Sequence, residues 1–237
     1  LAHLIAGPYT ESHAHRDQGS FVLYRGDWLL DDQNRRSHSG IEQDDTMHNL
    51  VRFVDGGGVV TMVEGAPQSQ MVALADHPSF TYALANVTPI YNAKEQVVKS
   101  EREFLFLKPG TLVVFDRALA NSAGVARVFG LNVPTTPTIN GNLLTVVNGT
   151  NRADVVRIAP SGVPWVITTY GGSDFPLGGA RADASHSVGT ESLFLHVIST
   201  NQDVASVAAD NLTGMTGVTI TFTDGRRAIV RFANAGR

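Results

Sequence analysis

The chain has 237 residues, 43% of them hydrophobic, which is enough apolar material for a folded core. Its net charge of −4 and its lack of Lys/Arg blocks argue against a nucleic-acid partner, because phosphate binding needs a basic surface. There is no cysteine, so disulfides and thiolate chemistry are excluded, and no apolar run approaches the ~20 residues of a transmembrane helix.

The first residue is Leu1, with neither an initiator Met nor a signal-peptide pattern after it. We therefore expect a mature or excised piece of a longer chain.

From the first residues onward, apolar and polar side chains alternate with a period of two, punctuated by Gly, Pro, Asn and Asp. This pattern predicts strands separated by turns. We expect strands at residues 1–6, 12–24, 28–30, 48–54, 59–64, 70–75, 80–84, 97–107, 111–118, 126–133, 143–147, 153–158, 165–170, 192–199, 217–223 and 226–233. No segment of comparable length reads as an amphipathic helix.

Two hairpins are the most secure part of this prediction. Lys108-Pro109-Gly110 and Asp224-Gly225 carry turn chemistry between β-rich runs. A fixed repeat period is absent, which disfavours a propeller or solenoid. The expected fold is an all-β, large antiparallel β-sandwich of two sheets, forming a single domain over residues 1–237.

Two stretches, 33–47 and 171–190, are long and irregular. Structureless loops of more than ~12–15 residues are uncommon in compact domains unless they are functional or mobile. Either stretch could form the rim of a site.

Metal-binding and catalytic residue types are concentrated near the N-terminus, where five of the eight histidines lie within residues 1–48. If residues 12–24 form one strand, then His13, His15 and Asp17 point to the same face, because side chains alternate along a strand. Two imidazoles and a carboxylate would then converge in one short segment.

The next apolar run ends at Asp31-Asp32, as the second strand of a hairpin would, and His48 stands near the head of the following strand. A metal role for one of the two aspartates competes evenly with a solvated hairpin end. His196 alternates within an apolar strand, which is more typical of a core histidine than of a ligand.

The run SHAHRDQGSF at residues 12–21, with Asp31-Asp32 and then His48-Asn49 after it, resembles the C-terminal β-sandwich half of the heparinase II/III-like polysaccharide lyases. Residues 101–117 are similar to the "Arg, apolar strand, turn, apolar strand, Asp" stretch of that family. The match covers residues 12–55 and 97–118, and beyond Asn121 only compatible β character remains.

The resemblance implies a parent enzyme with an N-terminal α/α-toroid, absent from this chain, and an active site in the cleft between toroid and sandwich. Such enzymes cleave uronic-acid-containing polysaccharides, of the glycosaminoglycan or alginate-like kind, by β-elimination. The implied partners are an acidic polysaccharide and the toroid, and the implied location is periplasmic or secreted.

The resemblance also implies roles for individual residues. It makes His13 the catalytic histidine of the cleft, and it makes His15, Asp32 and His48 the ligands of a structural zinc ion, with Asp31 as the fallback aspartate. A set of two histidines and one carboxylate suits a divalent transition ion.

The sequence departs from the family after Asp32, because residues 33–40 lack the Gly and Tyr that many members have there. Arg35 and Arg36 in this loop are either solvated charges or a substrate-binding clamp for an anion, for which the guanidinium fork is suited.

A second function remains open, namely a carbohydrate-binding or packing β-sandwich with no chemistry of its own. The family's proton-transfer tyrosine belongs to the toroid, and no motif promotes any of the five tyrosines here. We therefore expect the isolated 237 residues to lack appreciable lyase activity.

Overall fold

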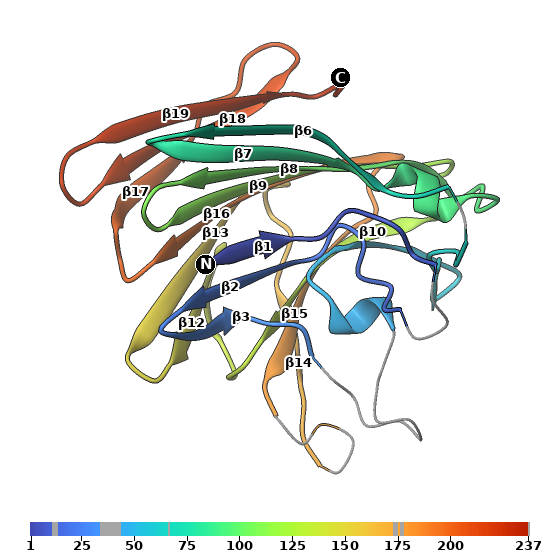
Figure 1. The fold of residues 1–237 in the computed structure, drawn as a ribbon, viewed down its shortest axis with the longest axis horizontal. Coiled ribbons are helices and arrows are strands. Elements are labelled where there is room, and N and C mark those ends of the chain that lie inside the picture. The colour runs from blue at the N-terminus through green and yellow to red at the C-terminus, as the bar shows by residue number, and fades with distance from the viewer. Residues whose placement is uncertain (11–13, 34–43, 66, 173–174, 176–177, 237) are drawn as a thin grey trace.

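The computed structural model describes residues 1–10, 14–33, 44–65, 67–172, 175 and 178–236 (Figure 1). Within these residues the only helical segments are two 3-10 turns, Asp45–Met47 and Thr88–Tyr91, so the expected all-β class is confirmed. The strands are β1 Ala2–Leu4, β2 Phe21–Arg25, β3 Asp27–Leu30, β4 Val51–Asp55, β5 Gly58–Val59, β6 Gln70–His77, β7 Phe80–Asn86, β8 Val97–Leu107, β9 Thr111–Ala120, β10 Ala126–Val133, β11 Thr138–Asn140, β12 Leu143–Asn148, β13 Asn151–Ala159, β14 Val166–Thr169, β15 Ala180–His186, β16 Glu191–Thr200, β17 Val204–Ala209, β18 Met215–Phe222 and β19 Arg227–Ala233.

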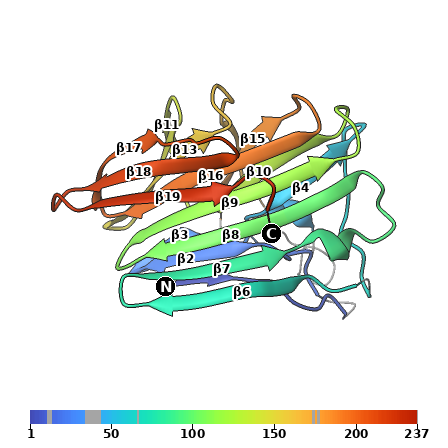
Figure 2. The same cartoon turned by 90° about the horizontal axis from the view of Figure 1, so that it is seen from above.

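The strands form layers on either side of one large antiparallel sheet. This sheet has eight strands in the order β11-β12-β13-β16-β9-β8-β7-β6. One of its faces is covered by the sheets β1-β2-β3 and β14-β15-β10-β4-β5, and the other by β17-β18-β19 (Figures 1 and 2). The sandwich expected from the sequence therefore carries a third, smaller layer.

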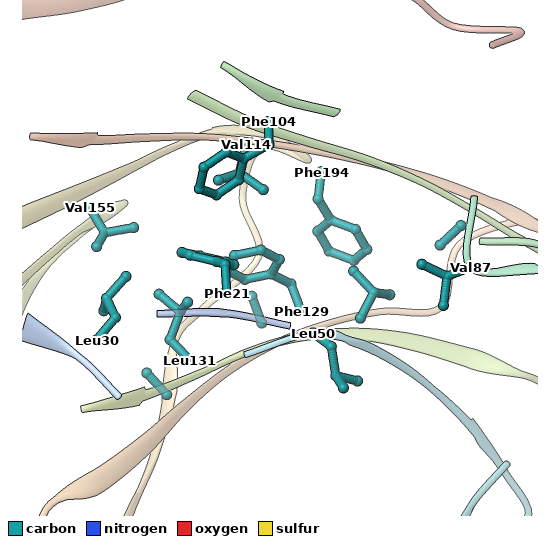
Figure 3. Packing of buried hydrophobic residues seen from close by; sticks show 14 of the residues in the cluster. Phe21, Leu30, Leu50, Val87, Phe104, Val114, Phe129, Leu131, Val155 and Phe194 are labelled. Atoms are coloured by element: carbon teal, nitrogen blue, oxygen red, sulfur yellow. The ribbon is translucent and has the colours of Figure 1, made fainter. Parts of the chain in front are cut away.

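Strand β9 explains why both faces of the central sheet are covered. Its run Leu112-Val113-Val114-Phe115 is apolar at every position, so it offers apolar side chains to both faces. Leu112 and Val114 belong to the main core, while Val113 and Phe115 pack against β18 and β19. Figure 3 shows the main core, where Val114 lies above Phe21 and Phe129.

Both expected hairpins are present, as β8-β9 and β18-β19. The bounds of β8 and β10 agree with the expected strands 97–107 and 126–133. These segments combine strict alternation or continuous apolar runs with clear turn residues at their ends, which is where local sequence is most informative.

The prediction of one strand over residues 12–24 was wrong, because β2 covers only 21–25. A turn precedes β2, in which Ser20 N donates to Asp17 O at 2.7 Å and Gly19 has a φ of +87°. The argument that placed Asp17 on one strand face with the histidines therefore fails.

The expected irregular stretch 171–190 was also wrong in part, since it contains β15, which pairs with β10 and β14. Ala180, Ala182 and Ala184 of this strand are fully buried in the main core. Their alternation was hidden because Ala, Gly and Asp are poor strand formers. Of the expected strand 59–64, only Val59 lies in a strand, as part of the two-residue β5.

None of the helices in the described residues is long and apolar enough to cross a membrane.

Candidate functional site

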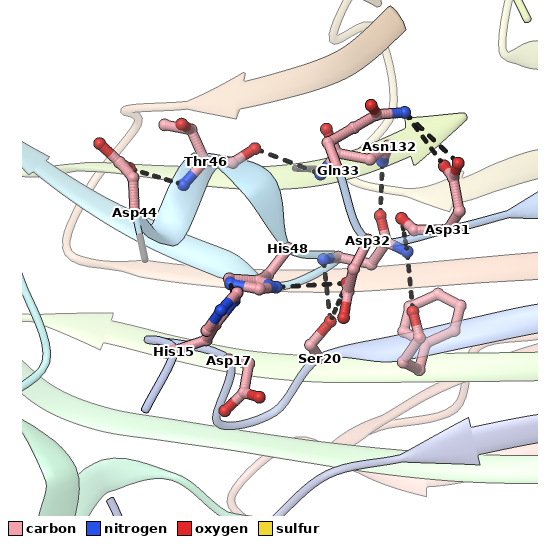
Figure 4. A network of polar contacts seen from close by, with 12 residues as sticks. His15, Asp17, Ser20, Asp31, Asp32, Gln33, Asp44, Thr46, His48 and Asn132 are labelled. Carbon is pink, nitrogen blue, oxygen red and sulfur yellow. Dashed lines mark hydrogen bonds and ion pairs between the residues drawn. The ribbon is translucent and has the colours of Figure 1, made fainter. Parts of the chain in front are cut away.

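Three of the side chains singled out in the sequence meet where the ends of three segments come together (Figure 4). His15 lies in the irregular segment before β2, Asp32 follows β3, and His48 lies between the 3-10 turn Asp45–Met47 and β4. The β2-β3 hairpin and the start of β4 thus bring together groups that are up to 33 residues apart.

The contacts form a row from His15 through His48 to Asp32. His15 Nδ1 lies 3.3 Å from His48 Nε2, and the two rings meet edge to face at 61°. On the other side of the ring, His48 Nδ1 lies 3.3 Å from Asp32 Oδ1. His48 is 2% exposed, so its contacts are shielded from solvent.

The donor set suits zinc in type and in the spacing of the histidine nitrogens. Zn–N bonds of about 2.0–2.1 Å place neighbouring tetrahedral ligands about 3.3 Å apart, which is the separation of His15 Nδ1 and His48 Nε2. His48 Nδ1 is buried and makes no hydrogen bond within the described residues, although Asp32 Oδ1 lies 3.3 Å away.

Asp32 does not point to the place where His15 Nδ1 and His48 Nε2 could share a metal ion. No group of three or more His, Cys, Asp or Glu side chains converges on one potential metal position in the described part of the chain. Asp32 faces the other ring nitrogen of His48, where carboxylates commonly orient a metal-binding imidazole.

The two neighbouring aspartates have different surroundings. Asp32 accepts from Ser20 Oγ at 3.1 Å, whereas Asp31 contacts Gln33 Nε2 at 3.4 Å and lies away from His48 (Figure 4). Burial, and secondly the charge of Asp32, raise the pKa of Asp31 to about 7. Asp32 is therefore the aspartate of the pair that adjoins the histidines.

Other carboxyl groups near the site are also affected by burial. Burial raises the pKa of Asp45 to about 7, although Arg16 Nη1 lies 3.9 Å from its carboxylate. Burial also raises the pKa of Asp17, which hydrogen-bonds Gln18. The carboxyl groups around the histidines are thus held in a poorly solvated environment.

Asn49, which the sequence reasoning quoted after His48 but gave no role, is a structural centre of the site. Its Nδ2 donates to Phe21 O at 2.7 Å and to Asp31 O at 3.0 Å, its backbone N donates to Ser20 Oγ at 3.0 Å, and its Oδ1 accepts from Asn132 N. The fully buried amide therefore joins β2, β3 and β10 beside His48. Its place directly after His48 at a strand start was the available signal.

Arg102 fixes the same region from the central sheet. Its guanidinium forms a forked pair with Asp116, at 2.6 and 3.1 Å, and Nη1 donates to Gly19 O and Asn49 O. Burial raises the pKa of Asp116, but the bound guanidinium opposes this shift. Residues 101–117, the second stretch of the resemblance, thus hold the segments that carry His15 and His48.

Three predicted site residues, His13, Arg35 and Arg36, lie outside the described residues. Most of the loop 33–47 does too, and its described end is the 3-10 turn that leads to His48.

Comparisons with known proteins add evidence on the fold. Neither protein-family models nor curated proteins give a match to this sequence. Among solved structures, a heparinase III matches with a TM-score of 0.71 at 11% identity, over 98% of this chain and 38% of that one. The heparan sulfate lyase HepC from Pedobacter heparinus matches with a TM-score of 0.76 at 14% identity, over 98% of this chain and 39% of that one.

The chain thus spans about two fifths of the length of these enzymes, and the matched portion is their C-terminal part. The structural likeness expected from the motifs at residues 12–55 and 97–118 is confirmed. The chain has the β-sandwich fold found in the C-terminal part of heparinase III and heparan sulfate lyase structures.

Proposed function

We propose that this chain is the β-sandwich module of a polysaccharide lyase that cleaves uronic-acid-containing polysaccharides by β-elimination. The observation that carries the proposal is the meeting of His15, His48 and Asp32. It occurs in a sandwich that is similar, over 98% of its length, to part of a heparinase III and part of a heparan sulfate lyase.

In the proposed reaction a base removes the C5 proton of a uronic acid, the C4–O bond breaks, and a C4–C5 double bond forms. The leaving oxygen takes up a proton. The reaction takes place in a cleft between this sandwich and an N-terminal toroid of the parent chain. In this proposal His13 faces the sugar from the sandwich, and the toroid supplies the proton-transfer tyrosine. Arg35 and Arg36 bind the substrate's acidic groups. A periplasmic or secreted location accompanies this function.

The second part of the proposal is a structural zinc ion bound by His15 and His48, with Asp32 as the third ligand, which requires its carboxylate to turn from His48 Nδ1 toward the ion. Because its ligands come from three segments, the ion would tie them together, and its binding free energy would add to the stability of the fold. It would also fix the segment that presents His13, in the way that supporting shells orient catalytic groups.

Metal analysis and melting of the purified chain test the zinc site. We expect about one zinc per chain and a lower melting temperature after chelation. His15→Ala should contain no zinc, and chelator should not change its melting temperature. His77→Ala, at an exposed position on β6, serves as a matched histidine control. A metal-free protein whose melting is unchanged by chelator would rule the zinc site out.

Turnover of the full-length enzyme tests the role of His13. His13→Ala should lower turnover by about 10²-fold or more, the size of general acid-base contributions, with zinc content and melting retained. Full turnover in His13→Ala would refute its catalytic role. Sugar binding without any elimination in the intact wild-type protein would favour the alternative, a carbohydrate-binding sandwich.

A further inference from the structure

A pocket of about 250 Å³ opens beside the candidate site, between the segment 44–47 and strands β14 and β15. Its lining includes Thr46, Thr168, Tyr170, Phe175 and Arg181. The strand β15 and the turn at Asp45–Met47 belong to the two stretches that the sequence marked as rims of a site. The pocket therefore lies beside the segment that leads to His48.

One wall of the pocket is aromatic and the rest is largely polar. The rings of Tyr170 and Phe175 stack with centroids 4.3 Å apart at 12°. Thr168 and Thr169 are exposed on β14, and Asp44 is partly exposed at the opposite side. Binding sites for small polar molecules combine such apolar surface with a few placed hydrogen-bonding groups. A sugar ring, with apolar faces and a hydroxyl rim, has matching chemistry.

On the β15 side of the pocket, two arginines share one carboxylate, while Asp44 lies on the opposite lining. Arg181 Nε donates to Asp183 Oδ2 at 2.9 Å, and Arg52 pairs with the other oxygen of the same carboxylate. A Cβ at Gly130 would lie 3.1 Å from Asp183 and 3.2 Å from Arg52, so the missing side chain leaves room for this pair. Arg52 is 4% exposed, whereas Arg181 lines the pocket. Arg181 therefore presents a positive group on one wall of the pocket, and Asp44 a carboxylate on the other.

Asn132 connects the pocket to the candidate site. Tyr170 Oη donates to Asn132 Oδ1 at 2.9 Å, and Asn132 Nδ2 donates to Thr46 O at 3.2 Å. The backbone N of Asn132 donates to Asn49 Oδ1, next to His48. The aromatic wall and the histidines are thus positioned by one continuous set of hydrogen bonds.

We propose that this pocket is a subsite for one acidic sugar unit, whose carboxylate or sulfate pairs with Arg181 while its ring lies against Tyr170 and Phe175. The inference rests on the proposed function for the identity of the polymer. In this arrangement Asp44 and Thr168 face sugar hydroxyls. Because the pocket adjoins the segment that leads to His48, this subsite would set which unit of the polymer reaches the cleft.

Equilibrium binding to the 237-residue protein tests the subsite without any need for turnover. The probes are tetragalacturonate, which carries carboxylates only, a heparan sulfate tetrasaccharide, and neutral cellotetraose. We expect an acidic probe to bind and Arg181→Ala to weaken it by about 10- to 100-fold, the effect of losing a charge-assisted hydrogen bond. Thr168→Trp, at an exposed position beside Arg181 on the neighbouring strand, should block binding while leaving Arg181 in place.

Arg231→Ala is the matched control, because it also removes an arginine paired with an aspartate, Asp210, but lies on β19. Circular dichroism and melting identify any variant that fails to fold, and Arg181→Lys retains the charge without the fork. Equal binding by Arg181→Ala, Thr168→Trp and wild type, equal affinity for cellotetraose, or no binding of either acidic probe would each overturn the subsite. If the full-length wild-type enzyme showed no elimination but still bound an acidic probe through Arg181, only the proposed reaction would be contradicted.

Discussion

At the scale of single residues, Asn49 contributes more to the candidate site than its neutral side chain suggests. Its amide is fully buried and makes hydrogen bonds to Phe21, Asp31 and Asn132, each on a different strand or strand end. A buried partner that loses its hydrogen bond keeps its desolvation cost. Truncating Asn49 would therefore leave several backbone groups unsatisfied at once.

We expect Asn49→Ala to lower the free energy of unfolding by about 2–4 kcal/mol and to weaken zinc binding. Chemical denaturation and metal titration measure the two effects. Asn121→Ala, on the exposed turn after β9, is the control and should change neither. A variant as stable as wild type would show that Asn49 does not hold the three strands together.

His196 is a second buried residue with an unusual environment. Its ring stacks on Phe129 with centroids 3.8 Å apart, and neither ring nitrogen has a hydrogen-bond partner within the described residues. Burial, and secondly the charge of Arg157, lower its pKa well below the usual value of 6.5. The histidine is thus a core residue, as its place in an apolar strand indicated, but its polar atoms are unsatisfied.

The pH dependence follows from this shift. Above pH 6.5 the ring is neutral in both folded and unfolded chains, whereas below it the unfolded chain binds a proton that the folded one excludes. Stability is therefore lost as the pH falls below 6.5. We expect His196→Phe to be more stable than wild type at pH 7 by about 1–3 kcal/mol, with a larger advantage at pH 5. Equal slopes of stability against pH between 5 and 7 for the two proteins would contradict this.

At the scale of elements, the sheet β17-β18-β19 forms a layer with its own small core. Phe232 of β19 stacks on Phe115 of β9, with ring centroids 4.9 Å apart at 10°. Phe115, Val113 and Val197 face this layer from the central sheet. This second core is separated from the histidines by the central sheet, so damage to it should stay local.

Phe232→Ala should cost about 3–5 kcal/mol, the usual range for a buried aromatic side chain. We expect amide exchange to become faster in β17, β18 and β19, while binding of zinc at His15 is retained. Ile229→Ala, on the same strand but 55% exposed, is the control and should change stability by less than about 0.5 kcal/mol. Faster exchange spread evenly over β2, β4 and β10 would indicate that the layers unfold together.

At the scale of the whole molecule, the proposed function gives this chain only one part of a catalytic centre. His13 is the one catalytic group that the proposed reaction assigns to it, and the proton-transfer tyrosine is assigned to the toroid. We expect the isolated 237 residues to produce no unsaturated uronate, measured as new ultraviolet absorbance on an acidic polysaccharide. Robust product formation by this chain alone would show that the complete catalytic set lies within it.

Local sequence determined the all-β class, the strands β8 and β10, and the hairpins at Lys108-Pro109-Gly110 and Asp224-Gly225. Alternation and turn chemistry act between neighbours in the chain, so these features can be read without the fold. The resemblance also drew attention to His15, Asp32 and His48, which the structure places in contact.

The strand at 180–186, the hydrogen bonds of Asn49 and the Arg181 pocket could be found only in the folded structure, because burial and hydrogen bonding depend on which surfaces meet. The alanine-rich segment 180–186 is a strand because it pairs with β10 and β14, and its small side chains pack in the main core. The fold paired Asn49 with Asn132, 83 residues away, and joined Tyr170 to Asn132. No local pattern encodes such partners, so the framework of the site and the Arg181 pocket emerge only when the layers pack together.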